Sequence, residues 1–304
     1  MRFAAIDIGT NSTRLLVKEI HGSSYLDLVR DMKITRLGEN LDKTRVISDK
    51  AALRTCRAIE EYKEVINKSN VEKVKTIGTE ALRKAENSGR FQNMVKEKTG
   101  LEVEVIDGLE EARLSFLGVT YLQETHLDKN ILIIDIGGGS TEFILGTKRS
   151  GTVFLESIDI GSVVLTENIQ PGKKNIDEAI HLVKTKLTKT LQRLKDYKIF
   201  KVIGLAGTIT TLASIDLGLV SYKREKIHLH CLSFSKIISM LKSFLEKDLE
   251  ERKKIVGIDS RRADIIIAGT IILKVILEHL NIKKITVSEN DILDGIIYSI
   301  LDFC

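Results

Sequence analysis

Tryptophan is absent from this 304-residue sequence, proline occurs once, and there are only three cysteines. Cys56, Cys231 and Cys304 are widely scattered and form no Cys-x-x-Cys or Cys/His cluster with metal-ligand spacing, which argues against a disulfide framework and a zinc site. Aromatic residues make up 5% of the chain, so platforms that stack nucleic-acid bases are not indicated. We therefore expect a protein of a reducing compartment with no nucleic-acid polymer as partner.

Long apolar runs are missing as well. None reaches the roughly 18 to 20 residues of a membrane span, and the first ten residues lead directly into a strand pattern, which leaves no room for a signal peptide. We expect a cytoplasmic protein without membrane contact. The net charge of +5 comes from Lys and Glu interspersed along helix faces, as on an ordinary solvated surface; a surface that attracts a polyphosphate or nucleotide is the alternative.

A pattern of strand, glycine turn and strand occurs twice. FAAIDI, GTNS and RLLVKEI form the first copy, and NILIIDI, GGGST and EFILG form the second. Aligning the copies pairs Asp7 with Asp135 and Ser12 with Ser140 at a constant offset of 128 residues, which indicates an internal duplication. Strands and helices alternate elsewhere, so we predict an α/β fold. We predict two domains, residues 1–124 and 125–304. In an alternative arrangement, the last helix packs back on the first domain.

Three glycine turns follow apolar strands: GTNS, GGGST and AGT. Glycine lets successive backbone amides approach an anion closely, and such a nest binds phosphate oxygens. A Walker A loop does not occur, and the dinucleotide fingerprint requires a helix where a strand follows here. The predicted phosphate-binding residues are Gly9, Thr10, Asn11, Ser12, Gly137, Gly138, Gly139, Ser140, Thr141, Gly207 and Thr208.

Acidic residues flank these turns. Asp135 ends its strand and Glu142 begins the next, so the two stand on opposite arms of one hairpin and are candidate Mg²⁺ ligands, with Asp7 as a weaker third. Turn capping is the alternative role. Glu110 and Glu111 stand in the first turn of a predicted helix, about 100° apart, so only one of them faces a cleft. The alternative is that this acidic pair only compensates the helix dipole.

Six segments in order resemble the exopolyphosphatase/guanosine pentaphosphate phosphatase (Ppx/GppA) family. They are AAIDIGTNSTRLLV, GTEALRKA, GLEEARLSFLGV, IDIGGGSTEFILG, GLAGTITTLA and RRADIIIAG. The resemblance implies a duplicated actin-like, ribonuclease H-like ATPase fold with two domains and an interdomain active-site cleft. It also implies that Glu111 is the base that activates water, that Arg83 holds phosphate, and that Asp135 and Glu142 bind Mg²⁺.

The function that the resemblance implies is hydrolysis of a phosphoanhydride, with release of terminal orthophosphate from polyphosphate or guanosine pentaphosphate. Alternatives are an ATP-dependent small-molecule kinase of the same fold and a non-catalytic alarmone or polyphosphate sensor. Long exopolyphosphatases carry an additional helical C-terminal region, whereas this sequence stops at Cys304, so we expect a short binding track and distributive cleavage. The sequence leaves open the preferred substrate, the number of metal ions and whether the protein is a homodimer.

Overall fold

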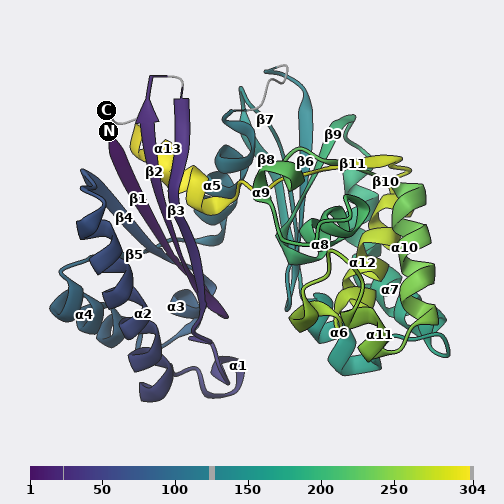
Figure 1. The fold of residues 1–304 in the computed structure, drawn as a ribbon, viewed down its shortest axis with the longest axis horizontal. Coiled ribbons are helices and arrows are strands. Elements are labelled where there is room, and N and C mark those ends of the chain that lie inside the picture. The colour runs from purple at the N-terminus through teal and green to yellow at the C-terminus, as the bar shows by residue number, and fades with distance from the viewer. Residues whose placement is uncertain (23, 123–126, 302–304) are drawn as a thin grey trace. The chain divides into compact units, whose positions relative to one another are not determined.

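The computed structural model describes residues 1–22, 24–122 and 127–301 of the chain. It divides into two compact units, residues 1–123 together with 290–304, and residues 124–289. Each unit is an α/β structure built on one mixed sheet, as the alternating strands and helices predict (Figure 1). Among the helices of the described residues, none combines the length and apolarity needed to cross a membrane.

Unit 1 has a five-stranded sheet in the order β3-β2-β1-β4-β5. Strands β1 and β2 are antiparallel, whereas β1, β4 and β5 run parallel. Its elements are β1 (Arg2–Ile8), β2 (Ser12–His21), β3 (Ser24–Ile34), α1 (Leu41–Thr44), α2 (Asp49–Lys68), β4 (Lys73–Gly78), α3 (Glu80–Lys84), α4 (Ser88–Thr99), β5 (Val103–Val105), α5 (Gly108–Thr120) and α13 (Ile292–Leu301).

Both faces of the unit 1 sheet are covered, because β1 is apolar on both sides. Ala4 and Ile6 belong to the core beneath α2 and α4, whereas Phe3 and Ala5 belong to a second core beneath α5 and α13. Successive side chains of a strand point to opposite faces, so this continuous apolar run specifies a central strand between two helical layers.

The C-terminal helix α13 belongs to unit 1, although 289 residues precede the last segment of that unit. It packs so closely on α5 that a Cβ at Gly118 would lie 1.9 Å from the Asp291 carbonyl oxygen, and one at Gly295 would lie 1.8 Å from that of Leu114. The second unit therefore ends at Glu289 rather than at residue 304, because glycines on both helices allow this backbone contact.

Unit 2 repeats the same sheet order as β8-β7-β6-β9-β11 and adds β10 at the edge. Strands β6, β9 and β11 are parallel and β7 is antiparallel to β6. Its elements are β6 (Asn130–Ile136), β7 (Thr141–Thr147), β8 (Gly151–Ile158), α6 (Ser162–Ile169), α7 (Ile176–Leu194), β9 (Ile199–Leu205), α8 (Ala206–Asp216), α9 (Arg224–Ile227), β10 (Cys231–Ser233), α10 (Phe234–Glu246), α11 (Leu249–Lys253), the 3₁₀ helix η1 (Ser260–Arg262), α12 (Ile266–His279) and β11 (Lys284–Val287).

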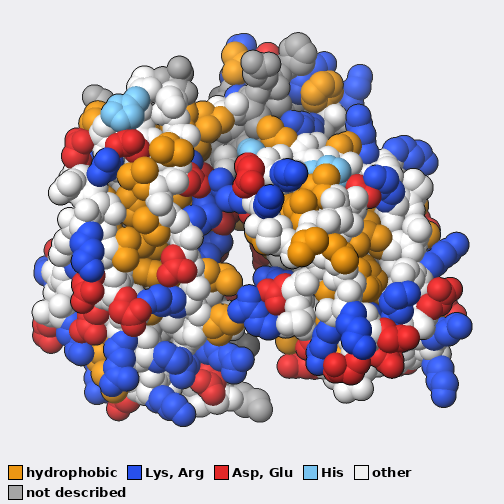
Figure 2. Space-filling view, in the orientation of Figure 1, with side chains coloured by type: hydrophobic (Ala, Val, Ile, Leu, Met, Phe, Trp, Pro, Cys, Tyr) orange, Lys and Arg blue, Asp and Glu red, His pale blue; other side chains and the backbone are white. Residues whose placement is uncertain are grey.

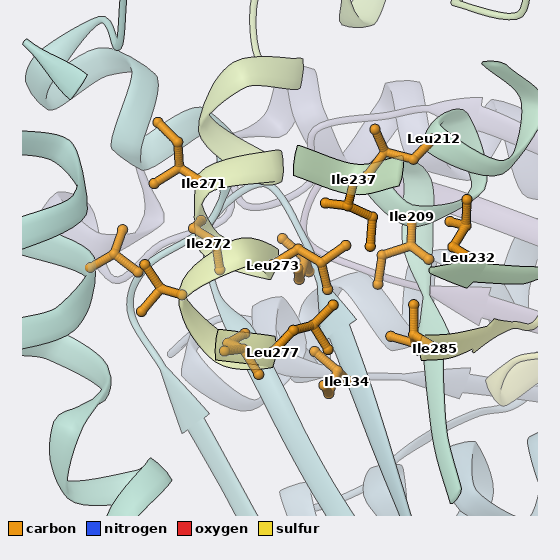
Figure 3. Close-up of a cluster of buried hydrophobic side chains, with 14 of the residues drawn as sticks. Ile134, Ile209, Leu212, Leu232, Ile237, Ile271, Ile272, Leu273, Leu277 and Ile285 are labelled. Atoms are coloured by element: carbon orange, nitrogen blue, oxygen red, sulfur yellow. The ribbon is translucent and has the colours of Figure 1, made fainter. Parts of the chain in front are cut away.

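Helix α12 is the centre of the unit 2 core. It is apolar around most of its circumference, with the ion pair of Lys274 and Glu278 on the remaining side, which is typical of a helix largely enclosed by other elements. Ile272, Leu273 and Leu277 lie among side chains from the sheet, such as Ile134, and from α10, such as Ile237 (Figure 3). The matching sheet orders of the two units confirm the duplicated fold that the sequence indicates.

Candidate functional site

The two hairpin turns have the same geometry. The Gly9 amide donates to the Ser12 carbonyl at 3.0 Å, and the Gly137 amide donates to the Ser140 carbonyl at 3.0 Å. A Cβ at either glycine would stand 3.2 or 3.3 Å from that carbonyl oxygen, so a side chain would crowd the turn at both places. The predicted equivalence of the two turns is therefore confirmed in their hydrogen bonding.

The second turn is seated on the start of α6. The Gly138 carbonyl accepts hydrogen bonds from the amides of Val163 and Val164 at 2.9 and 3.2 Å. Gly161 packs so tightly on the turn that a Cβ there would lie 2.3 Å from the Gly138 carbonyl oxygen. Gly139 is exposed and Ser140 is half-buried, so the turn presents this part of its backbone to solvent from a fixed support.

The first turn is held by the segment that follows β3. The Thr10 carbonyl accepts the Gly38 amide at 2.9 Å, and the Asn11 carbonyl accepts the amides of Thr35 and Arg36 at 3.0 and 2.8 Å. Thr10 and Asn11 themselves are exposed. Their carbonyls are thus engaged by neighbouring backbone while their side chains face solvent.

Thr141 is one of the predicted phosphate-binding residues, but its side chain does not face the turn. Its side chain is fully buried and its hydroxyl donates to the Ile160 carbonyl at 2.6 Å. The reason is strand alternation, since Thr141 is the first residue of β7 and points toward the interior. Only its backbone is placed to take part in the turn.

The residues that flank the two turns differ in charge. In β6 and β7, Asp135 stands directly opposite Glu142, whereas in β1 and β2 the equivalent position opposite Asp7 is Arg14. Opposed residues on neighbouring antiparallel strands have Cβ atoms about 4.5–5.5 Å apart, and like charges there are destabilising. The second repeat therefore concentrates negative charge where the first repeat has an ion pair.

Asp7 is committed to that ion pair. The Arg14 guanidinium donates to its Oδ2 atom at 2.5 and 2.9 Å and also reaches Asp291 at 2.7 Å. Burial raises the pKa of Asp7 and Arg14 offsets part of this effect. The ion pair occupies one oxygen of the carboxylate, whereas its Oδ1 atom is buried without a hydrogen-bond partner among the described residues.

The Asp135 and Glu142 pair fits Mg²⁺ by donor type. Mg²⁺ is usually bound by one or two carboxylates together with water and substrate phosphates, without a complete protein cage. Glu142 also accepts hydrogen bonds from Ser140 at 2.5 Å and Ser157 at 2.8 Å, which fix its Oε1 atom beside the turn. Within the described part of the chain, no three His, Cys, Asp or Glu side chains lie close enough together to hold a metal ion. A metal site with three such protein ligands is therefore not found among the described residues.

The predicted catalytic pair Glu111 and Arg83 is in direct contact. Arg83 in α3 donates to Glu111 Oε2 at 2.7 Å and, from the same nitrogen, to the Ile106 carbonyl at 2.9 Å. Glu111 lies in the first turn of α5, which begins after Asp107 caps it by accepting the Glu110 amide at 2.8 Å. The side chains of Arg83 and Glu111 are 29% and 34% exposed, so both remain accessible to a ligand.

Glu110 faces a different partner. Arg113, one helical turn later, donates to both of its carboxylate oxygens at 2.7 and 2.8 Å. This bidentate hydrogen bonding holds the pKa of Glu110 below its usual value. Because adjacent helical residues point about 100° apart, only Glu111 of this pair reaches α3.

The third glycine turn leads into α8, as the sequence indicates. Gly207 and Thr208 lie in its first turn, where backbone amides without helical partners favour anions. Thr208 is buried, and Ala206 has a positive φ of 65°, which costs about 1–2 kcal/mol for a residue with a side chain. Backbone strain of this kind tends to occur at functional sites.

Arg262 is a neighbour of this turn that we did not predict. A Cβ at Gly207 would lie 1.8 Å from its Nη1 atom, so the guanidinium rests directly on the glycine backbone. Arg262 is the second arginine of the RRAD motif. The motif was informative in the sequence, but nothing in its spacing indicates contact with a turn more than fifty residues earlier.

Within each unit, the predicted residues gather at one edge of the sheet. In unit 1 the first turn follows β1, while Arg83 and Glu111 follow β4 and β5; in unit 2 the second turn follows β6, and Thr208 follows β9. These five strands run parallel within their sheets, and open α/β sheets bind ligands outside the carboxyl ends of their strands.

Comparison with known proteins finds one family over most of the chain. The model of the Ppx/GppA phosphatase family matches residues 16–303. A bifunctional 3-dehydroquinate synthase/phosphatase of Fusobacterium nucleatum is 37% identical over 306 residues, which cover 97% of this chain and 46% of that protein. Exopolyphosphatase 2 of Mycobacterium tuberculosis is 32% identical, with 98% of both chains covered.

A guanosine-5'-triphosphate,3'-diphosphate pyrophosphatase of Photobacterium profundum is 29% identical over 98% of this chain and 59% of its own length. The chain thus spans about half the length of two of these relatives and nearly all of the third. Among solved structures, the Ppx/GppA family member of Aquifex aeolicus superimposes with a TM-score of 0.88 at 31% identity, over 100% of this chain and 98% of that one.

Proposed function

The chain belongs to the Ppx/GppA phosphatase family, and from this membership we propose that it releases terminal orthophosphate from inorganic polyphosphate or guanosine pentaphosphate. The names of the Mycobacterium and Photobacterium relatives supply these two substrates. One observation carries the proposal: the contact between Glu111 and Arg83 at 2.7 Å joins a candidate base to a phosphate-binding cation at the ligand-binding edge of the sheet.

In the proposed reaction, Glu111 accepts a proton from a water molecule. The water oxygen attacks the terminal phosphorus, and the bridging P–O bond breaks with its electron pair leaving on the shortened phosphate chain. The products are orthophosphate and that shortened chain. Arg83 serves two purposes, because its guanidinium orients the Glu111 carboxylate and offers further donors to phosphate oxygens.

The glycine turns would bind the phosphate oxygens as charge spreads over them during transfer. Backbone amides aimed at a developing charge stabilise the transition state without needing to reorganise. Asp135 and Glu142 would hold Mg²⁺, which when bound neutralises negative charge on the phosphates. The opposed carboxylates support this assignment, since a cation between them relieves their repulsion.

We place the reaction in the cytoplasm. Cys56 and Cys231 are free thiols, and unpaired cysteines are typical of a reducing compartment.

The proposal is tested by orthophosphate release from tripolyphosphate, long-chain polyphosphate and guanosine pentaphosphate, each with Mg²⁺ and with a chelator. In ¹⁸O-labelled water, each released orthophosphate should carry one labelled oxygen, because water is the attacking group. No release from any of the three substrates would overturn the proposal. Transfer of phosphate from ATP to an added acceptor, without label from water, would instead identify a kinase.

A further inference from the structure

A surface cavity of about 560 Å³ lies in unit 1 between the end of β3 and the outer face of α2. We name it the basic groove and define it by Lys33, Ile34, Thr35, Lys50, Arg54, Arg57 and Glu61 of its lining. Figure 2 shows a band of hydrophobic side chains over the strands of unit 1, with Lys, Arg, Asp and Glu side chains intermixed beside it.

The basic groove is strongly positive. Lys50, Arg54 and Arg57 are spaced i, i+4 and i+7 along α2, so they share one face of the helix. From the first to the last they extend about 10 Å at a rise of 1.5 Å per residue. Lys33 adds a fourth cation from β3, and Glu61 is the one acid among the described lining residues; four positive charges minus one leave +3.

Two of these cations are not used by the fold. Arg54 donates to the carbonyl oxygens of Thr35 and Arg36 and to Glu39, and Lys33 contacts Glu61. For Lys50 and Arg57, the described residues provide neither an ion-pair partner nor a hydrogen-bond partner, and both side chains are exposed. Both side chains are therefore available to an anion at this cavity.

The basic groove adjoins the first glycine turn. Ile34 stands opposite Ser12 in the register of β2 and β3, and the Thr35 amide donates to the Asn11 carbonyl at 3.0 Å. Thr35 is also tied to β2 through its hydroxyl, 3.0 Å from that of Thr13. Two residues that line the groove, Ile34 and Thr35, are thus in direct backbone contact with the segment of the first turn.

We infer that the basic groove binds the phosphates of a linear polyphosphate beyond the terminal group, so that the chain runs from the first turn along α2. This inference rests on the proposed function, and it departs from the expectation of a short track. A row of cations suits a ligand with charge on every unit. Guanosine is a poorer match, because the described lining residues include no aromatic side chain on which a base could stack.

The test compares two double variants in a Glu111→Gln background, which keeps the ligand intact. Lys50→Gln with Arg57→Gln removes the two unpaired cations of the groove, and Lys63→Gln with Lys68→Gln removes the same charge from α2 outside it. Binding of labelled long-chain polyphosphate and of tripolyphosphate is measured by fluorescence anisotropy at several salt concentrations.

We expect the groove variant to bind long-chain polyphosphate about 25-fold more weakly, since each exposed cation near a polyanion contributes a factor of about five. Its salt dependence should also be shallower, while tripolyphosphate affinity and both affinities of the control should stay unchanged. Equal weakening by the two variants, or equal loss for the two ligands, would overturn the inference. If the parent protein releases no phosphate but the affinities differ as expected, the proposed function is wrong. The inference that the basic groove binds polyphosphate is then still supported.

Discussion

Replacing Glu111 by glutamine separates catalysis from folding in this protein. The amide keeps the shape of the carboxylate and can still accept a hydrogen bond from Arg83 through its oxygen. It cannot accept the proton of a water molecule at neutral pH. We expect turnover to fall by about 10² to 10⁴, the usual contribution of a general base.

The magnitudes show why unfolding would not explain such a loss. Both partners of the Glu111 ion pair are about one-third exposed, and pairs of this kind contribute about 0–1 kcal/mol to stability. A rate loss of 10² to 10⁴ corresponds to about 2.7–5.5 kcal/mol in the barrier. Since domains are typically stable by about 5–15 kcal/mol, losing 1 kcal/mol leaves nearly all molecules folded.

The assay is orthophosphate release with Mg²⁺ for Glu111→Gln and for the matched control Glu110→Gln. The control also removes a charge from the first turn of α5, but its partner is Arg113 on the same helix. We expect it to retain nearly full activity. Turnover of Glu111→Gln within a few-fold of the parent protein, or a comparable loss in Glu110→Gln, would refute the assignment of Glu111 as the base.

Three further predictions follow from contacts in the two units. Asp135→Asn and Glu142→Gln should each raise the Mg²⁺ concentration needed for half-maximal activity, and an unchanged Mg²⁺ curve in both would place the metal elsewhere. Asp294→Asn removes a fully buried carboxylate that lies 2.6 Å from the buried Lys18 ammonium, so it should destabilise the protein by about 3–5 kcal/mol at pH 7 in chemical denaturation. Burial lowers the pKa of Lys18, and Asp294 together with Asp27 and Tyr298 more than offsets this effect, so that the pKa stays above its usual value of 10.5. The stability that comes from this raised pKa is lost as the pH rises above that value. The difference in unfolding free energy between the parent protein and Asp294→Asn should therefore narrow above about pH 10, and a constant difference would contradict this account. Gly295→Ala should lower the free energy of unfolding by about 1–3 kcal/mol, because the new Cβ meets backbone of α5 rather than a flexible side chain; an unchanged denaturation midpoint would show that α13 can shift freely.

The duplicated hairpins could be predicted because their information is local. A strand, a turn and a strand are close in sequence, and the offset that pairs Asp7 with Asp135 also gives the observed register of both hairpins. The same offset pairs Arg14 with Glu142. The difference in charge between the two turns is therefore visible when the two sequence copies are aligned.

Contacts between distant segments were harder to predict. Strand β3 was not predicted, because charged residues lie on both of its faces and no clear alternation marks it. The contact between Arg83 and Glu111 joins residues 28 positions apart, and only the sheet order places their helices together. Helix α13 packs within unit 1 because Gly118 and Gly295 allow close backbone contact with α5. The sequence does not reveal which segments these glycines pack against.

The discontinuity of unit 1 has a consequence for synthesis on the ribosome. Residues 124–289 emerge before the segment that contains α13, and 166 residues at about 5–20 residues per second take roughly 10–30 s. During that time Leu114 and Phe3, which are fully buried in the finished protein, lack the helix that covers them. Unit 2 can complete its core first, although it is encoded second. The nascent chain therefore exposes an apolar sheet face for many seconds, and we expect a chaperone that binds hydrophobic segments to crosslink to this face until α13 leaves the ribosome.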